Sequence, residues 1–81
     1  MLLLNCSVST RGGIKVELKD AATDKAIPGY SIKDCDLIYN DSLNRTVCWK
    51  GKSDISHLAG KEIRILFELQ DADIFAYHFG Q

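Results

Sequence analysis

The chain has 81 residues, of which 46% are hydrophobic and 26% are charged, and its formal net charge is −1. These values are ordinary for one small globular domain with a single core, so they exclude wholesale disorder and leave no room for a second domain. Because the 10 basic and 11 acidic residues are scattered along the chain, and because no apolar run approaches the roughly 20 residues of a membrane-spanning helix, we expect neither nucleic acid nor a membrane as a partner.

The N-terminal part alternates apolar and polar side chains, which is typical of half-buried β-strands. Leu2–Val8 carries one such run, and Gly13–Asp20 carries a second and more regular one. The intervening segment Ser9–Gly13 contains two adjacent glycines, which favour a tight turn. The sequence therefore predicts a first antiparallel hairpin.

The middle of the chain is less regular. Ala21–Lys25 is typical of a turn, and Pro28 excludes its segment from a central position in a sheet because proline lacks an amide hydrogen. A polar loop, Lys33–Ser42, follows, and Arg45–Lys50 then returns to strand-like composition. Ser53–Gly60 predicts one helical turn, with a capping serine or aspartate at its start and a glycine at its end.

The strongest alternation lies in Lys61–Gln70, and Ile74–Phe79 alternates as well. The polar break Asp71–Asp73 between them predicts a second hairpin. Together these segments predict an all-β fold, a small antiparallel β-sandwich of about six short strands with one short helical turn. We expect a single domain over residues 1–81.

Three cysteines are an odd number, so at most one internal disulfide is possible. Cys6 and Cys48 lie in strand-like segments and are expected to be small buried hydrophobes. Cys35 lies in the polar loop and is expected to be the reactive thiol. Whether Cys6 and Cys48 form a disulfide stays open.

The polar loop offers candidate ligands for a metal site. Asp34, Asp36 and Asp41 carry the oxygen ligands that Ca²⁺ prefers. Their spacing does not fit the twelve-residue calcium loop, and aspartates in loops more often bond to their own backbone. We therefore favour turn chemistry, and we expect no metal and no cofactor.

Aromatic side chains are the other candidates for ligand contact. Trp49, Tyr30 and Tyr39 would form a platform for a sugar ring if they were exposed together, and Tyr39 and Trp49 are the predicted ligand-binding residues. The single tryptophan of a small domain is more often part of the core, so we expect Trp49 to be buried and Tyr39 to be exposed. Neither His57 nor His78 lies in a recognised nucleophile motif, so we expect no enzymatic activity in this chain.

Seven short segments, which together span almost the whole chain, carry a resemblance to a known family. They are Leu3–Asn5, Gly13–Leu18, Ile27–Tyr30, Asp34–Asp36, Trp49–Gly51, Leu58–Lys61 and Leu69–Phe75. In their order they resemble the small C-terminal β-sandwich domain of bacterial glycoside-hydrolase-like proteins, which follows a catalytic propeller domain of the sucrose- and fructan-hydrolase type. The resemblance implies that the chain is the C-terminal part of a larger protein, whose catalytic residues lie in the propeller.

Three functions remain open at this point. The first is a non-catalytic accessory domain that packs on the propeller of its parent protein, with an exposed apolar patch around Leu3, Leu66 or Ile74. The second is an independent carbohydrate-binding module. The third is a protein-interaction domain that pairs through an edge strand, in which Pro28 blunts one edge and the first strand is the open one.

Overall fold

The computed structural model describes residues 1–80, which fold into one antiparallel β-sheet with irregular connections. The strands are β1 (Leu2–Asp20), β2 (Lys25–Ala26), β3 (Ser42–Thr46) and β4 (Ile63–Phe79), and a 3-10 turn, η1 (Ser56–Leu58), precedes β4. The predicted all-β class is confirmed. Among these residues, no helix is long and apolar enough to cross a membrane.

The long strands β1 and β4 pair with each other over almost their whole length. Leu2 lies opposite Phe79 at one end of the ladder, and Asp20 lies opposite Ile63 at the other. Both predicted hairpins are therefore wrong, because each supposed pair of short strands is one continuous strand. Residues 1–80 accordingly form four strands where the sequence predicts about six.

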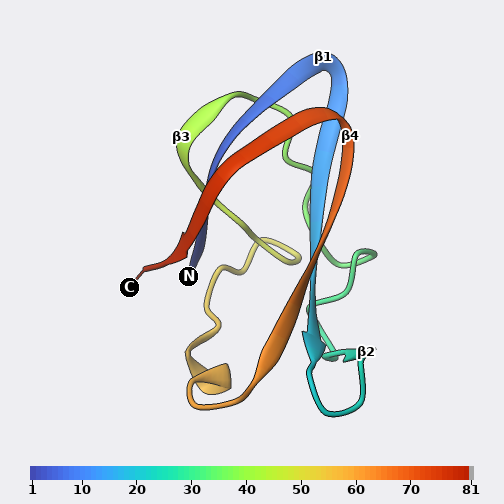
Figure 1. Cartoon of the computed structure of the whole chain (residues 1–81), viewed down its shortest axis with the longest axis vertical. Helices are drawn as coiled ribbons and strands as arrows, with labels where there is room; N and C mark the ends of the chain where they lie inside the picture. Colours follow the sequence, from blue (N-terminus) through green and yellow to red (C-terminus); the bar gives the residue numbers. More distant parts are fainter. Residues whose placement is uncertain (81) are drawn as a thin grey trace.

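The two predicted turns are bends that lie opposite each other in this ladder. The register of β1 and β4 shifts between Val8 and Gly13, and the paired strands arch over there, at the top of Figure 1. A Cβ atom on Gly12 would lie 2.5 Å from the carbonyl oxygen of Asp71 and closer still to that of Gln70. Glycine is needed at this position because the neighbouring backbone comes too close for a side chain.

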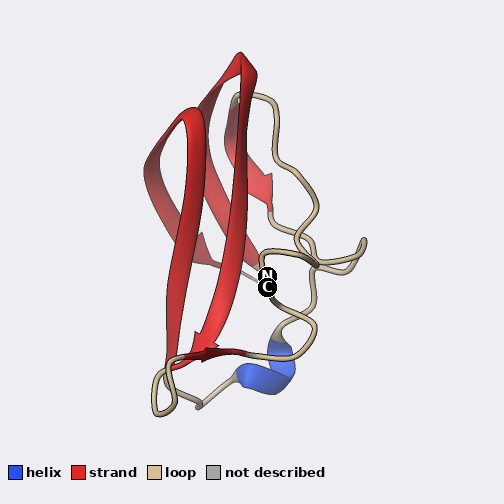
Figure 2. Cartoon of the chain, turned by 90° about the vertical axis from the view of Figure 1, so that its right-hand side faces the viewer, coloured by secondary structure: helices blue, strands red, loops and turns tan. Residues whose placement is uncertain are grey.

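One face of β1 forms the base of the hydrophobic core. Its alternate side chains are buried on both sides of the bend, as the sequence predicts, and these are Leu2, Leu4, Cys6, Val8, Ile14, Val16 and Leu18. Irregular segments and η1 cover this face (Figure 2), with the side chains of Ile27, Cys35, Ile38, Val47, Trp49, Ile55 and Leu58. The molecule is thus a bent sheet covered by connecting segments.

The connecting segments are held to β1 through its backbone. The amide and carbonyl of Ile14 bond to those of Ile38 at 2.9 and 3.0 Å, and the Leu18 amide donates to the Tyr30 carbonyl. β2 and β3 pair with β1 on this same side. The first strand is therefore central, and the prediction that it forms the open edge is wrong. Among the strands described, β2, β3 and β4 each pair with β1 alone, so β4 is the long edge strand on one side of β1 and the short strands β2 and β3 lie on its other side.

The helical turn before β4 forms as predicted, although it is short. The Asp54 carboxylate accepts a hydrogen bond from the Ser56 amide at 2.9 Å at its start. Gly60 follows its end with a φ of 81°, a left-handed conformation that glycine adopts without strain. This turn fixes the segment that forms one wall of the cleft described next.

Candidate functional site

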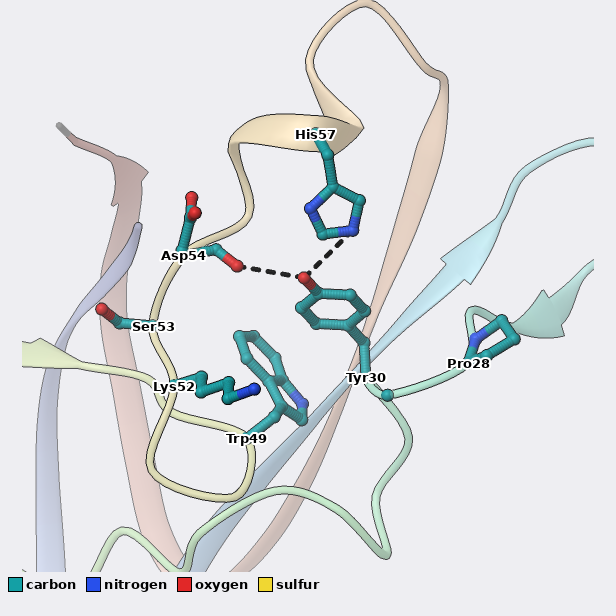
Figure 3. A pocket seen from close by; sticks show the side chains of 8 residues that line it. Pro28, Tyr30, Trp49, Lys52, Ser53, Asp54 and His57 are labelled. Carbon is teal, nitrogen blue, oxygen red and sulfur yellow. Dashed lines mark hydrogen bonds between the residues drawn. The ribbon is translucent and has the colours of Figure 1, made fainter.

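A cleft of about 530 Å³ opens between the segment that follows β2 and the segment that leads into η1. Figure 3 shows the side chains that line it. The lining residues are Pro28, Gly29, Tyr30, Trp49, Lys52, Ser53, Asp54 and His57. The cleft therefore combines the rings of Tyr30 and Trp49 with four polar side chains, those of Lys52, Ser53, Asp54 and His57, which come from distant parts of the sequence.

Tyr30 links the two walls of the cleft. Its hydroxyl donates to the backbone carbonyl of Asp54 at 3.0 Å and lies 3.2 Å from Nε2 of His57, as the dashed lines in Figure 3 show. Burial, and to a lesser degree the charge of Asp54, raises the pKa of the Tyr30 phenol. The phenol is therefore neutral at neutral pH and can donate a hydrogen bond.

Trp49 closes the inner end of the cleft. It is 2% exposed, as the sequence predicts, and its Nε1 donates to the carbonyl of Val16 at 2.9 Å. Its ring meets the ring of Tyr30 edge to face, with 5.2 Å between the centroids. Because the ring is buried, it supports Tyr30 and does not offer an open face on which a sugar could stack.

The outer part of the cleft is polar and carries charge. The Ser56 backbone amide and hydroxyl beside Asp54 hold the pKa of that carboxyl below its usual value, so the group is ionised at neutral pH. The Lys52 ammonium and the Ser53 hydroxyl are further hydrogen-bonding groups on the same wall. Such a set of donors and acceptors beside aromatic rings suits a ligand with several hydroxyl groups.

Tyr39, the second predicted ligand-binding residue, lies outside this cleft. It is 59% exposed, and the Arg45 guanidinium lies over its ring at 5.8 Å from the centroid. The expected exposure of Tyr39 is confirmed. The structure does not bring it together with Trp49 as an exposed platform, and a ligand contact at Tyr39 stays a prediction.

The three loop aspartates have separate partners. Asp34 accepts from the Ser31 hydroxyl at 3.0 Å and forms an ion pair with Lys50 at 3.3 Å. Asp36 accepts from the amide of Gly51 at 2.8 Å, and Asp41 accepts from that of Val8 at 2.6 Å. Each carboxylate thus stabilises backbone or loop structure. Over residues 1–80, no three acidic, histidine or cysteine side chains gather in a way that could hold a metal ion.

The cysteines are distributed differently from the prediction. All three are free, with Cys6 and Cys35 buried and Cys48 partly exposed. Cys35 accepts a hydrogen bond from the Val16 amide, and burial raises its thiol pKa. The prediction that Cys35 is the reactive thiol is therefore wrong, because its loop folds over the core and buries the sulfur. Cys48, expected to be buried, is the most accessible of the three.

A second candidate site is the aromatic surface, which we define as Phe75, Tyr77 and Phe79 near the end of β4. These side chains are 65%, 50% and 52% exposed. The Tyr77 ring lies 5.5 Å from that of Phe67 and 6.5 Å from that of Phe79, measured between centroids. Tyr77 and Phe79 pair with Leu4 and Leu2 and so lie on the core face of the sheet, beyond the covering segments.

The exposed apolar patch was expected around Leu3, Leu66 or Ile74. Leu66 is 43% exposed, on the face of β4 away from the core, whereas Leu3 is buried. Ile74 packs against the core because the register shift opposite Asn5 and Cys6 leaves Phe75 as an extra residue. The shift reverses the alternation that the sequence suggests, and it places Ile74 on the inner face and opens Phe75 to solvent.

The cleft could not be located from the sequence, because its polar residues belong to no motif and Tyr30 is far from His57 along the chain. Pairing of His57 with Tyr30 depends on the path of an irregular segment, which periodicity does not predict. Comparison with known proteins found no matching family model, no matching curated protein and no matching solved structure.

Proposed function

We propose that the chain is a non-catalytic accessory domain of a glycoside hydrolase, and that it packs through the aromatic surface of β4 against the catalytic propeller domain. The observation that carries the proposal is the exposure of Phe75, Tyr77 and Phe79 at one end of the sheet. Exposed apolar patches of this kind mark interaction sites. The identity of the partner rests on the resemblance of seven sequence segments to such domains.

The aromatic surface is large enough to matter energetically. An aromatic side chain has roughly 150–250 Å² of surface, so each half-exposed ring would remove about 100 Å² from water on docking, worth about 2–3 kcal/mol. Association of two domains in one polypeptide loses less entropy than association of free proteins. Three such rings would therefore suffice to hold the domains together.

The test uses a polypeptide in which this chain follows a hydrolase propeller. Replacing Phe75 and Tyr77 together with serine should lower the thermal midpoint of the propeller by several degrees. The midpoint of the isolated 81-residue variant is measured beside it, because Tyr77 also contacts Phe67 within the domain. Tyr39→Ser is the matched control, since it removes an exposed aromatic ring from another part of the surface. An unchanged propeller midpoint in the double variant would contradict the proposal.

A second candidate function is carbohydrate binding, and the cleft at Tyr30 is the observation that favours it. Its polar groups surround a neutral phenol donor and suit sugar hydroxyls. Titration of the chain with soluble oligosaccharides, followed by Trp49 fluorescence and by NMR shifts, tests this function. Loss of binding in Lys52→Ala and His57→Ala would show that the sugar binds in the cleft. Loss of binding in Tyr39→Ala would show that it binds at the exposed loop. No binding to any oligosaccharide of the panel would exclude carbohydrate binding.

A further inference from the structure

The outer edge of β4 is open along its length. Over residues 1–80, this strand pairs with β1 on one side and has no strand on the other, whereas β1 pairs on both sides. A strand of 17 residues with a free edge is a template for pairing with another strand. The side chains beside this edge determine which strand can pair with it.

The ladder determines which backbone groups reach the open edge. The Ala21 amide donates to the Glu62 carbonyl at 3.2 Å, and antiparallel strands alternate between residues that bond to the partner and residues that point away. Every second residue of β4 therefore directs its amide and carbonyl outward. These residues are Ile63, Ile65, Phe67 and Leu69. The opposite side of β1 agrees with this alternation, since Ile14 and Leu18 bond away from β4.

The side chains around Leu66 are self-complementary for antiparallel pairing. Arg64 and Glu68 stand two residues to either side of Leu66 on the face away from the core. A two-fold axis through Leu66 would place Arg64 opposite the partner's Glu68, twice over. On the core face, the same axis would place Ile65 opposite the partner's Phe67. Each contact thus joins opposite charges or two apolar side chains.

We propose that two copies of this chain pair through the open edge of β4, antiparallel, with Leu66 of one copy opposite Leu66 of the other. The sheet is then continuous across both copies, and the half-buried Ile65 and Phe67 gain apolar neighbours. The interaction extends over about residues 62–70. It leaves the aromatic surface at Phe75–Phe79 free, so it is independent of the proposed accessory function.

Neighbouring registers are less favourable. An axis through Arg64 or through Glu68 would place like charges directly opposite each other, which is destabilising. An axis through Ile65 or through Phe67 would place Leu66 against a charged side chain. The charges of β4 therefore select the register centred on Leu66.

The existing contact of Arg64 does not prevent this pairing. Its guanidinium lies 3.5 Å from Asp24, and both side chains are more than 60% exposed. Exposed ion pairs of this kind contribute little to stability and are screened by salt. Arg64 is therefore available to the partner's Glu68.

The experiment is sedimentation velocity of the 81-residue protein over a range of concentrations, with charge-reversal variants. We expect the wild-type chain to dimerise with a dissociation constant of roughly 100 µM, as is usual for a small interface. Arg64→Glu and Glu68→Arg each place like charges opposite each other at two positions, and each should weaken the dimer by roughly tenfold. Lys33→Glu, a charge reversal at an exposed residue outside β4, is the matched control and should dimerise as wild type.

Mixing the two single variants gives the decisive result. In a mixed pair, both acidic residues of the first variant face both basic residues of the second, so a heterodimer should form at the wild-type affinity or better. Circular dichroism confirms that each variant is folded. The proposal would be overturned if the wild-type chain stayed monomeric up to about 1 mM. It would also be overturned if the charge-reversal variants dimerised with the wild-type dissociation constant.

Discussion

Val16 illustrates how single side chains replace strand pairing in this molecule. Its amide donates to the Cys35 sulfur at 3.2 Å, and its carbonyl accepts from Trp49 Nε1 at 2.9 Å. In this part of β1, two side chains thus bond the backbone groups that face away from β4. The indole is therefore both a core ring and a hydrogen-bond donor.

We predict that Trp49→Phe destabilises the protein by about 1–3 kcal/mol, because the buried Val16 carbonyl loses its partner while most of the apolar ring remains. The measurement is urea denaturation followed by circular dichroism. Tyr39→Phe, which changes an exposed ring, should leave the unfolding free energy unchanged. A Trp49→Phe variant as stable as the wild type would show that the indole N–H contributes nothing.

We expect Asp34 to account for part of the fall in the unfolding free energy at acid pH. The Ser31 hydroxyl and the Lys50 ammonium hold the pKa of this carboxyl below its usual value. As the pH falls, the Asp34 carboxyl therefore takes up a proton in the unfolded state before it does so in the folded state. The stabilisation that Asp34 contributes to the folded state is fully present above the ordinary aspartate pKa of about 3.9, and it is lost as the pH falls through the lower folded pKa.

The variant Asp34→Asn cannot carry the charge, so we expect a shallower fall of the unfolding free energy between neutral and acid pH. Urea unfolding at a series of pH values measures this slope. Asp20 and Asp54, whose pKa values are also lowered, keep part of the slope in the variant. Identical slopes in both proteins would contradict the assignment to Asp34.

At the scale of the elements, the sequence predicts well which face of a strand is buried, and it predicts poorly where a strand ends and which strand it pairs with. The alternation in Gly13–Asp20 identifies the buried face of β1, because a half-exposed strand leaves a period of two in its own sequence. The glycines at Gly12 and Gly13 and the break at Asp71 have the chemistry of turns, yet they form one shared bend of a continuous ladder. Local composition cannot distinguish these outcomes, because the difference lies in which strand is the partner.

The bend yields a prediction with a matched pair of variants. Gly12→Ala should destabilise the protein by about 1–3 kcal/mol, because its Cβ would collide with the backbone carbonyls of Gln70 and Asp71. Gly13→Ala should destabilise the protein less, because its Cβ would contact the end of the Leu37 side chain, which can move. Thermal unfolding of both variants tests this order, and equal losses would contradict the close approach at Gly12.

The candidate cleft shows what single-sequence reasoning misses. Tyr30 and His57 lie in irregular segments that leave no periodic pattern, and their contact depends on how these segments cover β1. The burial of Trp49 was predictable from its size and rarity. The cleft in front of it was not, because it results from two loops meeting.

At the scale of the whole molecule, the dominant ladder joins the two ends of the described chain. The Met1 ammonium donates to the Gly80 carbonyl, and the Gly80 amide donates to the Met1 carbonyl, both at 2.8 Å. Figure 1 shows both ends side by side. Even at its nearer end, where Asp20 lies opposite Ile63, the ladder must close the loop of residues 21–62 before the first pair forms, and such long-range closure is slow in folding.

We predict that a circular permutant folds faster than the natural chain order. Joining residue 80 to residue 1 by a short Gly-Ser linker, with new ends between Thr23 and Asp24, turns β4 and β1 into a local hairpin. Stopped-flow refolding should accelerate by roughly tenfold because the loop to be closed is much shorter. Equal refolding rates would show that pairing of β1 with β4 is not the slow step.

The same ladder determines how the molecule would respond to mechanical force. Because its hydrogen bonds run perpendicular to the strands, a pull that separates Met1 from Gly80 loads the first pair alone and then each following pair in turn. Strands arranged this way open like a zipper, whereas strands pulled from opposite ends would resist in shear with all bonds at once. Held by its two ends, this domain would yield at low force, and the β4 strand would peel away from β1 toward the bend at Gly12.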